Sequence, residues 1–245
     1  MLLALDESDK KQKIQCIGLV ALPDQYVAEF EAAFAGLRLK NKFWQELKWE
    51  KIRADNAYAD RYKPFIDLFF KSHACFYVWS YPFPRKQDLV RYFDNSRGMV
   101  FHKYAYKLLA STGNKIGIAK HITNPNLHIV YDKGTYKSEE QIQFTKKLLL
   151  PKMKVPVVHC CEADSKILSL LQITDLLTGS AAAEANGEFT SKGKLQFYDY
   201  IIEKNKGMKI FSGQPVMPFG DLKIDGFAVT HPQPVTEFSV DDLPF

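Results

Sequence analysis

Three aspartates lie in or directly after strongly apolar stretches of the chain. Asp6 and Asp132 each end a short apolar run, and Asp175 lies inside a longer one. A carboxylate near a protein core is costly unless it is paired, protonated or bound to a cation. The apolar stretches are Leu2–Leu5, Leu127–Tyr131 and Leu170–Leu177.

Glu46 is a candidate fourth member of this acidic set. Carboxylates that converge without a matching cation repel one another, and a divalent ion removes that repulsion. Hard oxygen ligands suit Mg²⁺ or Mn²⁺. Two such ions, about 4 Å apart, would activate water and stabilise the leaving oxygen in phosphodiester cleavage. Taken singly, Asp6 or Asp132 is equally explained as a helix cap or a turn residue.

The acids are held by different kinds of predicted element. Asp6 and Asp132 follow predicted strands, and a side chain directly after a strand projects from the end of the sheet, where open α/β sheets place their sites. Asp175 lies on a predicted helix over Ser165–Ala185, whereas Glu46 lies between helices. On that helix one stripe is expected to hold Ser165, Leu168, Gln172, Asp175 and Gly179, so that Gln172 and Asp175 face the same way.

Strands and helices alternate along the chain, which is typical of an α/β fold. The predicted strands are Leu2–Leu5, Ile14–Leu22, Ala74–Tyr81, Leu127–Tyr131 and Val155–Cys161. The predicted helices are Tyr26–Leu39, Tyr62–Phe70, Lys86–Ala110, Ser138–Leu150, Ser165–Ala185 and Lys194–Lys204. We expect one domain over residues 1–206 and an irregular extension over 207–245, with short strands around Ile210 and over Leu222–Val229.

Four motifs resemble, in this order, the domain-of-unknown-function 3800 family, which is grouped with ribonuclease-H-like proteins. They are Asp6-Glu7-Ser8, Glu46-Leu47-Lys48-Trp49, the strand-end Asp132, and Ser165 followed by Leu171-Gln172-x-x-Asp175-Leu176-Leu177-x-Gly179. The resemblance covers about residues 1–190. It departs from the family at Asp9, where a glycine is usual, and in the segment after Gly207.

This resemblance implies a ribonuclease-H-like mixed β-sheet flanked by helices, with an acidic tetrad of catalytic metal ligands. Asp6 would bridge two Mg²⁺ or Mn²⁺ ions, with Glu46, Asp132 and Asp175 each holding one side. In supporting roles, Lys48 would contact the scissile phosphate, Gln172 would orient Asp175 or a water, and Ser8 belongs to the first motif. The pair Glu46-x-Lys48 also fits restriction-type nucleases, but Trp49 and its neighbours do not predict the strand that such a site needs.

Composition excludes disordered, collagen-like and low-complexity classes, because 46% of the 245 residues are hydrophobic and 25% charged. The net charge of +5 permits a polyanionic partner without requiring one. The four cysteines lack zinc-site spacing and are expected to be buried thiols. No apolar run predicts a signal peptide or a membrane span, so we expect a cytoplasmic protein without membrane contacts.

Two further segments have an open interpretation. Basic and aromatic residues interleave between Arg85 and Lys107, which fits either a nucleic-acid groove or, as we favour, an amphipathic helix with buried rings. His121 is a loose candidate for proton transfer. The tip Asp241-Asp242-Leu243-Pro244-Phe245 resembles the acidic tip of bacterial single-stranded-DNA-binding proteins and predicts partners that accept that tip; the alternative is a tail packed on its own domain.

The sequence therefore predicts a hydrolase, a divalent-metal-dependent nuclease that cleaves DNA or RNA by a two-metal mechanism. The alternative is a non-catalytic module of the same fold that binds nucleic acid or a partner protein and is recruited through its C-terminal tip. A regulatory toxin or a defence factor is a third possibility. The sequence does not predict an oligomeric state.

Overall fold

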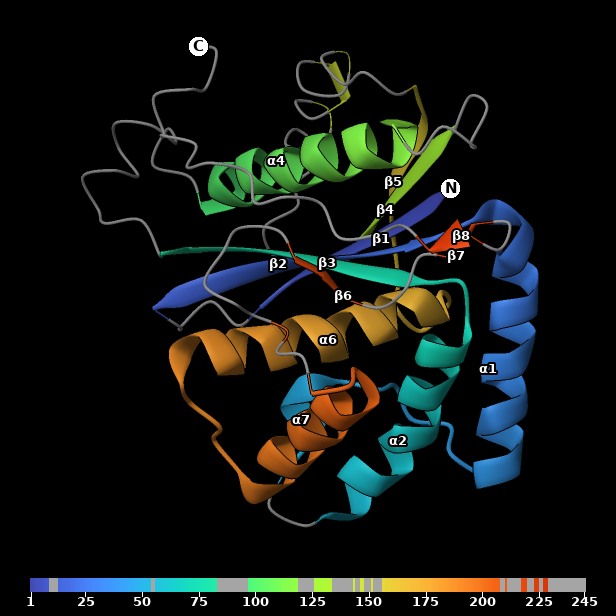
Figure 1. Ribbon diagram of the computed structural model, residues 1–245, viewed down its shortest axis with the longest axis vertical. Coiled ribbons are helices and arrows are strands. Elements are labelled where there is room, and N and C mark those ends of the chain that lie inside the picture. Colours follow the sequence, from blue (N-terminus) through green and yellow to red (C-terminus); the bar gives the residue numbers. More distant parts are fainter. Residues whose placement is uncertain are drawn as a thin grey trace.

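The computed structural model describes most of the chain and centres on one six-stranded mixed β-sheet (Figure 1). The strand order is β5-β4-β1-β2-β3-β6. The strands are β1 (Leu2–Glu7), β2 (Ile14–Leu22), β3 (Cys75–Pro82), β4 (Leu127–Asp132), β5 (Val157–Ala163) and β6 (Met217–Phe219). The described residues are 1–8, 13–53, 56–82, 97–118, 126–133, 143, 146–147, 151, 156–207, 210, 217–219, 223–224 and 227–228.

Strand β1 lies inside the sheet and has neighbours of opposite direction. It pairs antiparallel with β2, and the antiparallel pairing continues through β3 to β6. On its other side β1 pairs parallel with β4, which pairs parallel with β5. The register places Leu5 opposite Tyr131, so that Asp6 and Asp132 follow at the same end of neighbouring strands. The predicted α/β class with a mixed sheet flanked by helices is confirmed.

Helices cover both faces of the sheet. One face carries α4 (Arg97–Ile118), and the other carries α6 (Ser169–Asn186) together with the rest of the helical layer (Figure 1). That layer also holds α1 (Val27–Asn41), α2 (Asn56–Lys71) and α7 (Lys192–Lys204). Within the described residues no helix is long and apolar enough to cross a bilayer.

The strands divide their side chains between two hydrophobic cores by simple alternation. In β1, Leu2 and Ala4 join the core on the α6 side, whereas Leu3 and Leu5 join the core on the α4 side. This is the period of two that an extended strand imposes. Helix α6 lies very close to β2, because a Cβ added at Gly18 would come within 1.8 Å of Thr178 Oγ1.

The prediction of a helix starting at Ser165 is wrong, because α6 begins at Ser169. Residues 165–167 form a turn in which the Asp164 side chain accepts a hydrogen bond from Lys166 N at 2.9 Å. Leu168 then has extended backbone angles. An aspartate that binds a nearby backbone amide in this way competes with helix formation. Ser165 therefore approaches the site from a turn and not from the helical stripe.

Other predicted boundaries have mixed outcomes. Helix α4 extends to Ile118, past the predicted end at Ala110, because its backbone hydrogen bonds continue after the apolar spacing stops. Ile210 lies in a bend and not in a strand, while β7 (Lys223–Ile224) and β8 (Phe227–Ala228) fall where short strands were predicted. Most of the predicted helix Ser138–Leu150 lies outside the described residues.

Candidate active site

Asp6 and Asp132 point to the α6 side of the sheet. Alternation determines this direction, since Ala4 and Val130, two residues earlier in each strand, belong to the core on that side. Both residues are buried, with 6% and 8% of their surface exposed. The backbone of the sheet thus brings two carboxylates to one end of adjacent parallel strands, on the face that α6 covers.

Asp175 reaches the same space from α6 and is fixed by the chain opposite it. Its Oδ2 accepts a hydrogen bond from Trp49 N at 2.6 Å. One helical turn later, Gly179 leaves room for the Trp49 indole, because an added Cβ would lie 2.2 Å from Trp49 Cγ. Helix α6 therefore contacts the short 3₁₀ turn Trp49–Lys51 in two places. The Asp175 carboxylate accepts a hydrogen bond from the turn, and the Trp49 indole packs against the helix at Gly179.

Glu46 lies in an irregular segment that is held by side chains. The Ser165 hydroxyl donates a hydrogen bond to Glu46 Oε1. Gln172 Oε1 accepts from Leu47 N at 2.9 Å and from an Arg38 Nη at 2.8 Å, while its Nε2 donates to the Ser165 carbonyl at 2.7 Å. Gln172 therefore connects the Glu46 segment to α6, to α1 and to the turn after β5.

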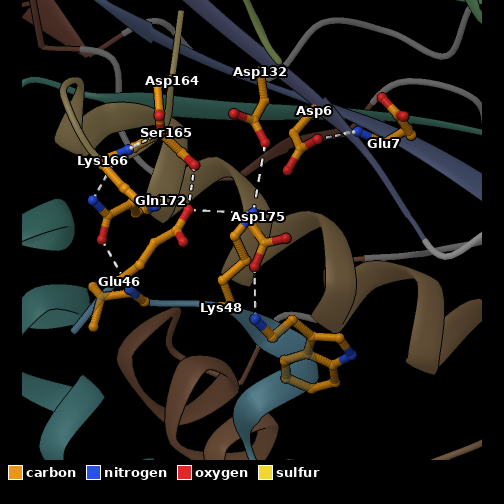
Figure 2. Close-up of polar contacts among 12 residues, drawn as sticks. Asp6, Glu7, Glu46, Lys48, Asp132, Asp164, Ser165, Lys166, Gln172 and Asp175 are labelled. Carbon is orange, nitrogen blue, oxygen red and sulfur yellow. Dashed lines mark hydrogen bonds and ion pairs between the residues drawn. The ribbon is translucent and has the colours of Figure 1, made fainter. Parts of the chain in front are cut away.

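Lys48 is the cation among these carboxylates. Its Nζ lies 3.3 Å from Glu46 Oε1 and 3.8 Å from Asp132 Oδ2. Figure 2 shows this ammonium between the two carboxylates, with Asp175 and Asp6 beside it. Burial opposes the charge on Lys48, but Asp175, Asp132 and Glu46 outweigh it and raise the pKa of this ammonium above its usual range. Lys48 thus stays protonated throughout the physiological range.

The carboxyl group of Asp175 has an unusual proton affinity. Burial raises its pKa from 3.8 to about 6, and the negative charges of Asp132 and Glu50 add to the effect. The Trp49 amide and Lys48 act in the opposite direction. Burial is thus the main cause of the raised pKa, and the neighbouring carboxylates disfavour the charged form further.

The donor set has the chemistry that a hard divalent cation requires, since every candidate ligand is a carboxylate. The side chains are arranged around Lys48, however. Within the described part of the chain, no three histidine, cysteine, aspartate or glutamate side chains are grouped closely enough to hold a metal ion. In this arrangement the Lys48 ammonium lies against the Glu46 and Asp132 oxygens.

The structure brings most of the predicted site residues together, while the hydroxyl of Ser8 bonds to the hairpin backbone. Asp6, Asp132, Asp175, Glu46 and Lys48 share one neighbourhood, with Gln172 behind Glu46 (Figure 2). Ser8 is buried in the β1–β2 hairpin, where its hydroxyl accepts a hydrogen bond from Cys16 N at 2.8 Å. Its contact is with the hairpin backbone.

Sequence reasoning missed three contributors: Arg38, the Ser165 hydroxyl and the Trp49 backbone amide. Ser165 was visible as a motif residue, although its role was not. Nothing in the sequence distinguishes Arg38 from the other cations of its amphipathic helix, which are expected to be exposed. The Trp49 region forms a 3₁₀ turn and not the strand that a restriction-type site needs, as predicted.

Several predictions concern residues that the structure does not describe. These are His121, the tip Asp241–Phe245 and the first part of the basic and aromatic segment. In the described part of that segment, Phe101 is 2% exposed and packs in the core on the α4 side of the sheet. Phe101 agrees with the interpretation of an amphipathic helix with buried rings, whereas Lys103 is buried as well and is not a solvated cation.

No protein family matches the chain. No curated protein matches it either.

Proposed function

We propose that this protein is a divalent-metal-dependent nuclease that hydrolyses phosphodiester bonds of DNA or RNA. The observation that carries the proposal is the meeting of strand-end carboxylates with Asp175 around a single ammonium. Asp6 and Asp132 come from adjacent parallel strands, and Asp175 comes from the helix that covers them. Among the described residues, the carboxylates of Glu46, Asp132 and Asp175 outnumber the nearby cations Lys48 and Arg38, which favours the binding of a further cation.

The same proposal includes a ribonuclease-H-like fold. It is supported by Asp6 on the first strand and Asp132 on the strand beside it, in a mixed sheet with helices on both faces. A location in the cytoplasm belongs to the proposal as well. The four cysteines support it, since all are free thiols and Cys16, Cys75 and Cys160 are buried.

Each site residue has a distinct part in the proposed reaction. Asp6, Glu46, Asp132 and Asp175 would hold two Mg²⁺ or Mn²⁺ ions. Bound there, such ions supply water activation and charge stabilisation at the leaving oxygen. Lys48, released from its ion pairs when the carboxylates are neutralised, is placed to bind the scissile phosphate.

The surrounding contacts orient the carboxylates. The Trp49 amide fixes one oxygen of Asp175 and leaves the other for a ligand. The Ser165 hydroxyl fixes Glu46, and Gln172 holds the backbone beside it. Such partners of metal ligands contribute to affinity because they set ligand orientation before binding.

A second candidate function is a non-catalytic module that binds nucleic acid. The position of the Lys48 ammonium favours this candidate. Its ion pair with Glu46 can be the arrangement that the site keeps in place of a bound metal. This candidate predicts tight nucleic-acid binding without cleavage in the presence of any metal.

The deciding experiment incubates the full chain with end-labelled single- and double-stranded DNA and RNA, in Mg²⁺, Mn²⁺ or EDTA. We expect cleavage that requires a metal and that is lost in Asp132→Asn. The matched control is Asp199→Asn, an exposed aspartate of α7, which should cleave like the natural chain. Cleavage in EDTA, or unchanged cleavage by Asp132→Asn, would contradict the proposal.

A further inference from the structure

An exposed tryptophan lies two residues before Glu46. Trp44 is 67% exposed, whereas the other two tryptophans, Trp49 and Trp79, are each 9% exposed. A large aromatic ring in water loses the stabilisation that burial would give it. An exposed Trp44 beside a candidate active site therefore needs an explanation in terms of a ligand.

The backbone around Trp44 is fixed on both sides. Helix α1 ends at Asn41, and Lys42 adopts left-handed angles, with φ 49° and ψ 43°. Phe43 turns inward, is 3% exposed and packs against aromatic rings of α2. One Arg38 Nη donates to the carbonyls of Phe43 and Gln45, at 3.3 and 2.8 Å. The indole is thus held outward by a rigid segment.

Exposed lysines occur just before Trp44 in the chain and in the turn that bonds Glu46. Lys40 and Lys42 are exposed on the same segment. Lys166 is exposed in the turn after β5, and its neighbour Ile167 is 81% exposed. The Ser165 hydroxyl joins that turn to Glu46, so the two segments meet at the candidate ligand. Aromatic and apolar side chains with interleaved lysines match the bases and phosphates of a nucleic-acid strand.

We infer that Trp44 is a stacking platform for an unpaired base of a single-stranded nucleic acid, with Lys40 and Lys42 binding the adjoining phosphates. The inference rests on the proposed function and adds its substrate class. A single strand is required because the faces of bases in a duplex are already covered by their neighbours. Two residues of chain span at most about 7 Å, so one strand can contact both Trp44 and Glu46.

The test measures binding in EDTA, where metal-dependent cleavage plays no part. Labelled oligo(dT), oligo(U) and a mixed-sequence DNA duplex are titrated with protein, following anisotropy and tryptophan fluorescence. We expect both single strands to bind more tightly than the duplex and to quench the fluorescence of Trp44. A difference between the two single strands would tell whether DNA or RNA is preferred.

Substitutions at Trp44 separate stacking from general surface effects. Trp44→Ala should weaken single-strand binding by about tenfold or more, as loss of one stacked base does, and should abolish the quenching. Trp44→Phe keeps an aromatic face and should retain most of the affinity. The control is Leu195→Ala, since Leu195 is an exposed apolar residue of α7, at 42% exposure, and should bind normally. Thermal unfolding should be the same for all variants.

The outcomes distinguish the inference from the proposed function. Equal affinity of Trp44→Ala and the natural chain for both single strands would overturn the platform, even if metal-dependent cleavage is found. A preference for the duplex that persists in Trp44→Ala would also overturn it. Binding that depends on Trp44, in a protein that cleaves nothing in any metal, would support the platform and contradict the nuclease.

Discussion

The carboxylates of the candidate site are held in two different ways. Asp6 and Asp132 are held by the sheet, since the backbone register and the alternation of strand side chains place them. Glu46 is held by an irregular segment whose position depends on Ser165, Gln172 and Arg38. The first arrangement uses backbone hydrogen bonds, whereas the second uses individual side chains that one substitution can remove.

This difference predicts which substitutions disturb the arrangement of the site. The sheet holds Asp6 and Asp132 in places that a substitution in a loop does not move. The Glu46 segment, in contrast, can be displaced by a substitution that removes one of its side-chain contacts. We expect substitutions of Asp6 or Asp132 to lower the cleavage rate without changing the fold. Substitutions of the residues that hold Glu46 should lower the cleavage rate and also disturb the local structure.

The largest expected effect on cleavage comes from substituting Asp132, a candidate metal ligand held by the sheet. Asp132→Asn should lower metal-dependent cleavage by about a thousandfold or more, because a neutral amide is a poor ligand for Mg²⁺. Thermal unfolding in EDTA should change little, since the strand register does not depend on this side chain. A large loss of stability would show that Asp132 acts mainly as a structural partner of Lys48.

A smaller loss of cleavage is expected for a substitution at Gln172, which holds the backbone beside Glu46. Gln172→Met keeps the volume but removes the hydrogen bonds to Leu47, Arg38 and Ser165, so cleavage should fall by about 10- to 100-fold. The control Ser180→Ala, also in α6, removes a buried hydroxyl that bonds only within the helix. Equal losses in both variants, measured as initial cleavage rates, would mean that any polar change in α6 is damaging.

A change on the helix should displace the Trp49 turn. In Gly179→Ala the new methyl group would overlap the indole, and we expect a loss of about 1–3 kcal/mol in the free energy of unfolding. Near-ultraviolet circular dichroism should report the altered ring. Gly36→Ala, with nothing near its Cβ in helix α1, should instead be neutral or slightly stabilising.

The buried charge of Asp175 predicts a pH dependence. Burial raises its folded-state pKa to about 6 from 3.8, so the folded protein binds more protons than the unfolded chain between these values. Stability therefore falls as the pH rises from about 4 to about 6. Asp175→Asn should be more stable than the natural chain by about 3 kcal/mol at pH 7 in EDTA. The difference should vanish near pH 4 in denaturant titrations.

The smallest effect is expected at Ser8, which follows β1 and bonds to the backbone of β2. Ser8→Ala leaves the buried Cys16 amide without its hydroxyl acceptor and should cost about 1 kcal/mol in unfolding free energy. Metal-dependent cleavage should stay within about twofold of the natural rate. A loss of cleavage larger than the loss of stability explains would give Ser8 a part in the chemistry.

The sheet and its acids were largely predictable because they follow from local patterns. The strand at Ile14–Leu22 was predicted with the bounds that the structure has, since a continuous apolar run specifies a buried strand. Strand ends at Asp6 and Asp132 came from the same reasoning. The start of α6 was missed because a single side-chain contact, from Asp164 to Lys166 N, stops the helix, although the apolar spacing continues through Leu168.

The sequence by itself determined which residue types can do chemistry here and that several end apolar strands or lie in an apolar helix. Only the tertiary structure decided that Asp6 and Asp132 face α6, that Lys48 lies between Glu46 and Asp132, and that Arg38 and Gln172 hold the Glu46 segment. The physical reason is that hydrophobic periodicity is a local property of the chain. Contacts between residues more than a hundred positions apart depend on how the packed layers meet.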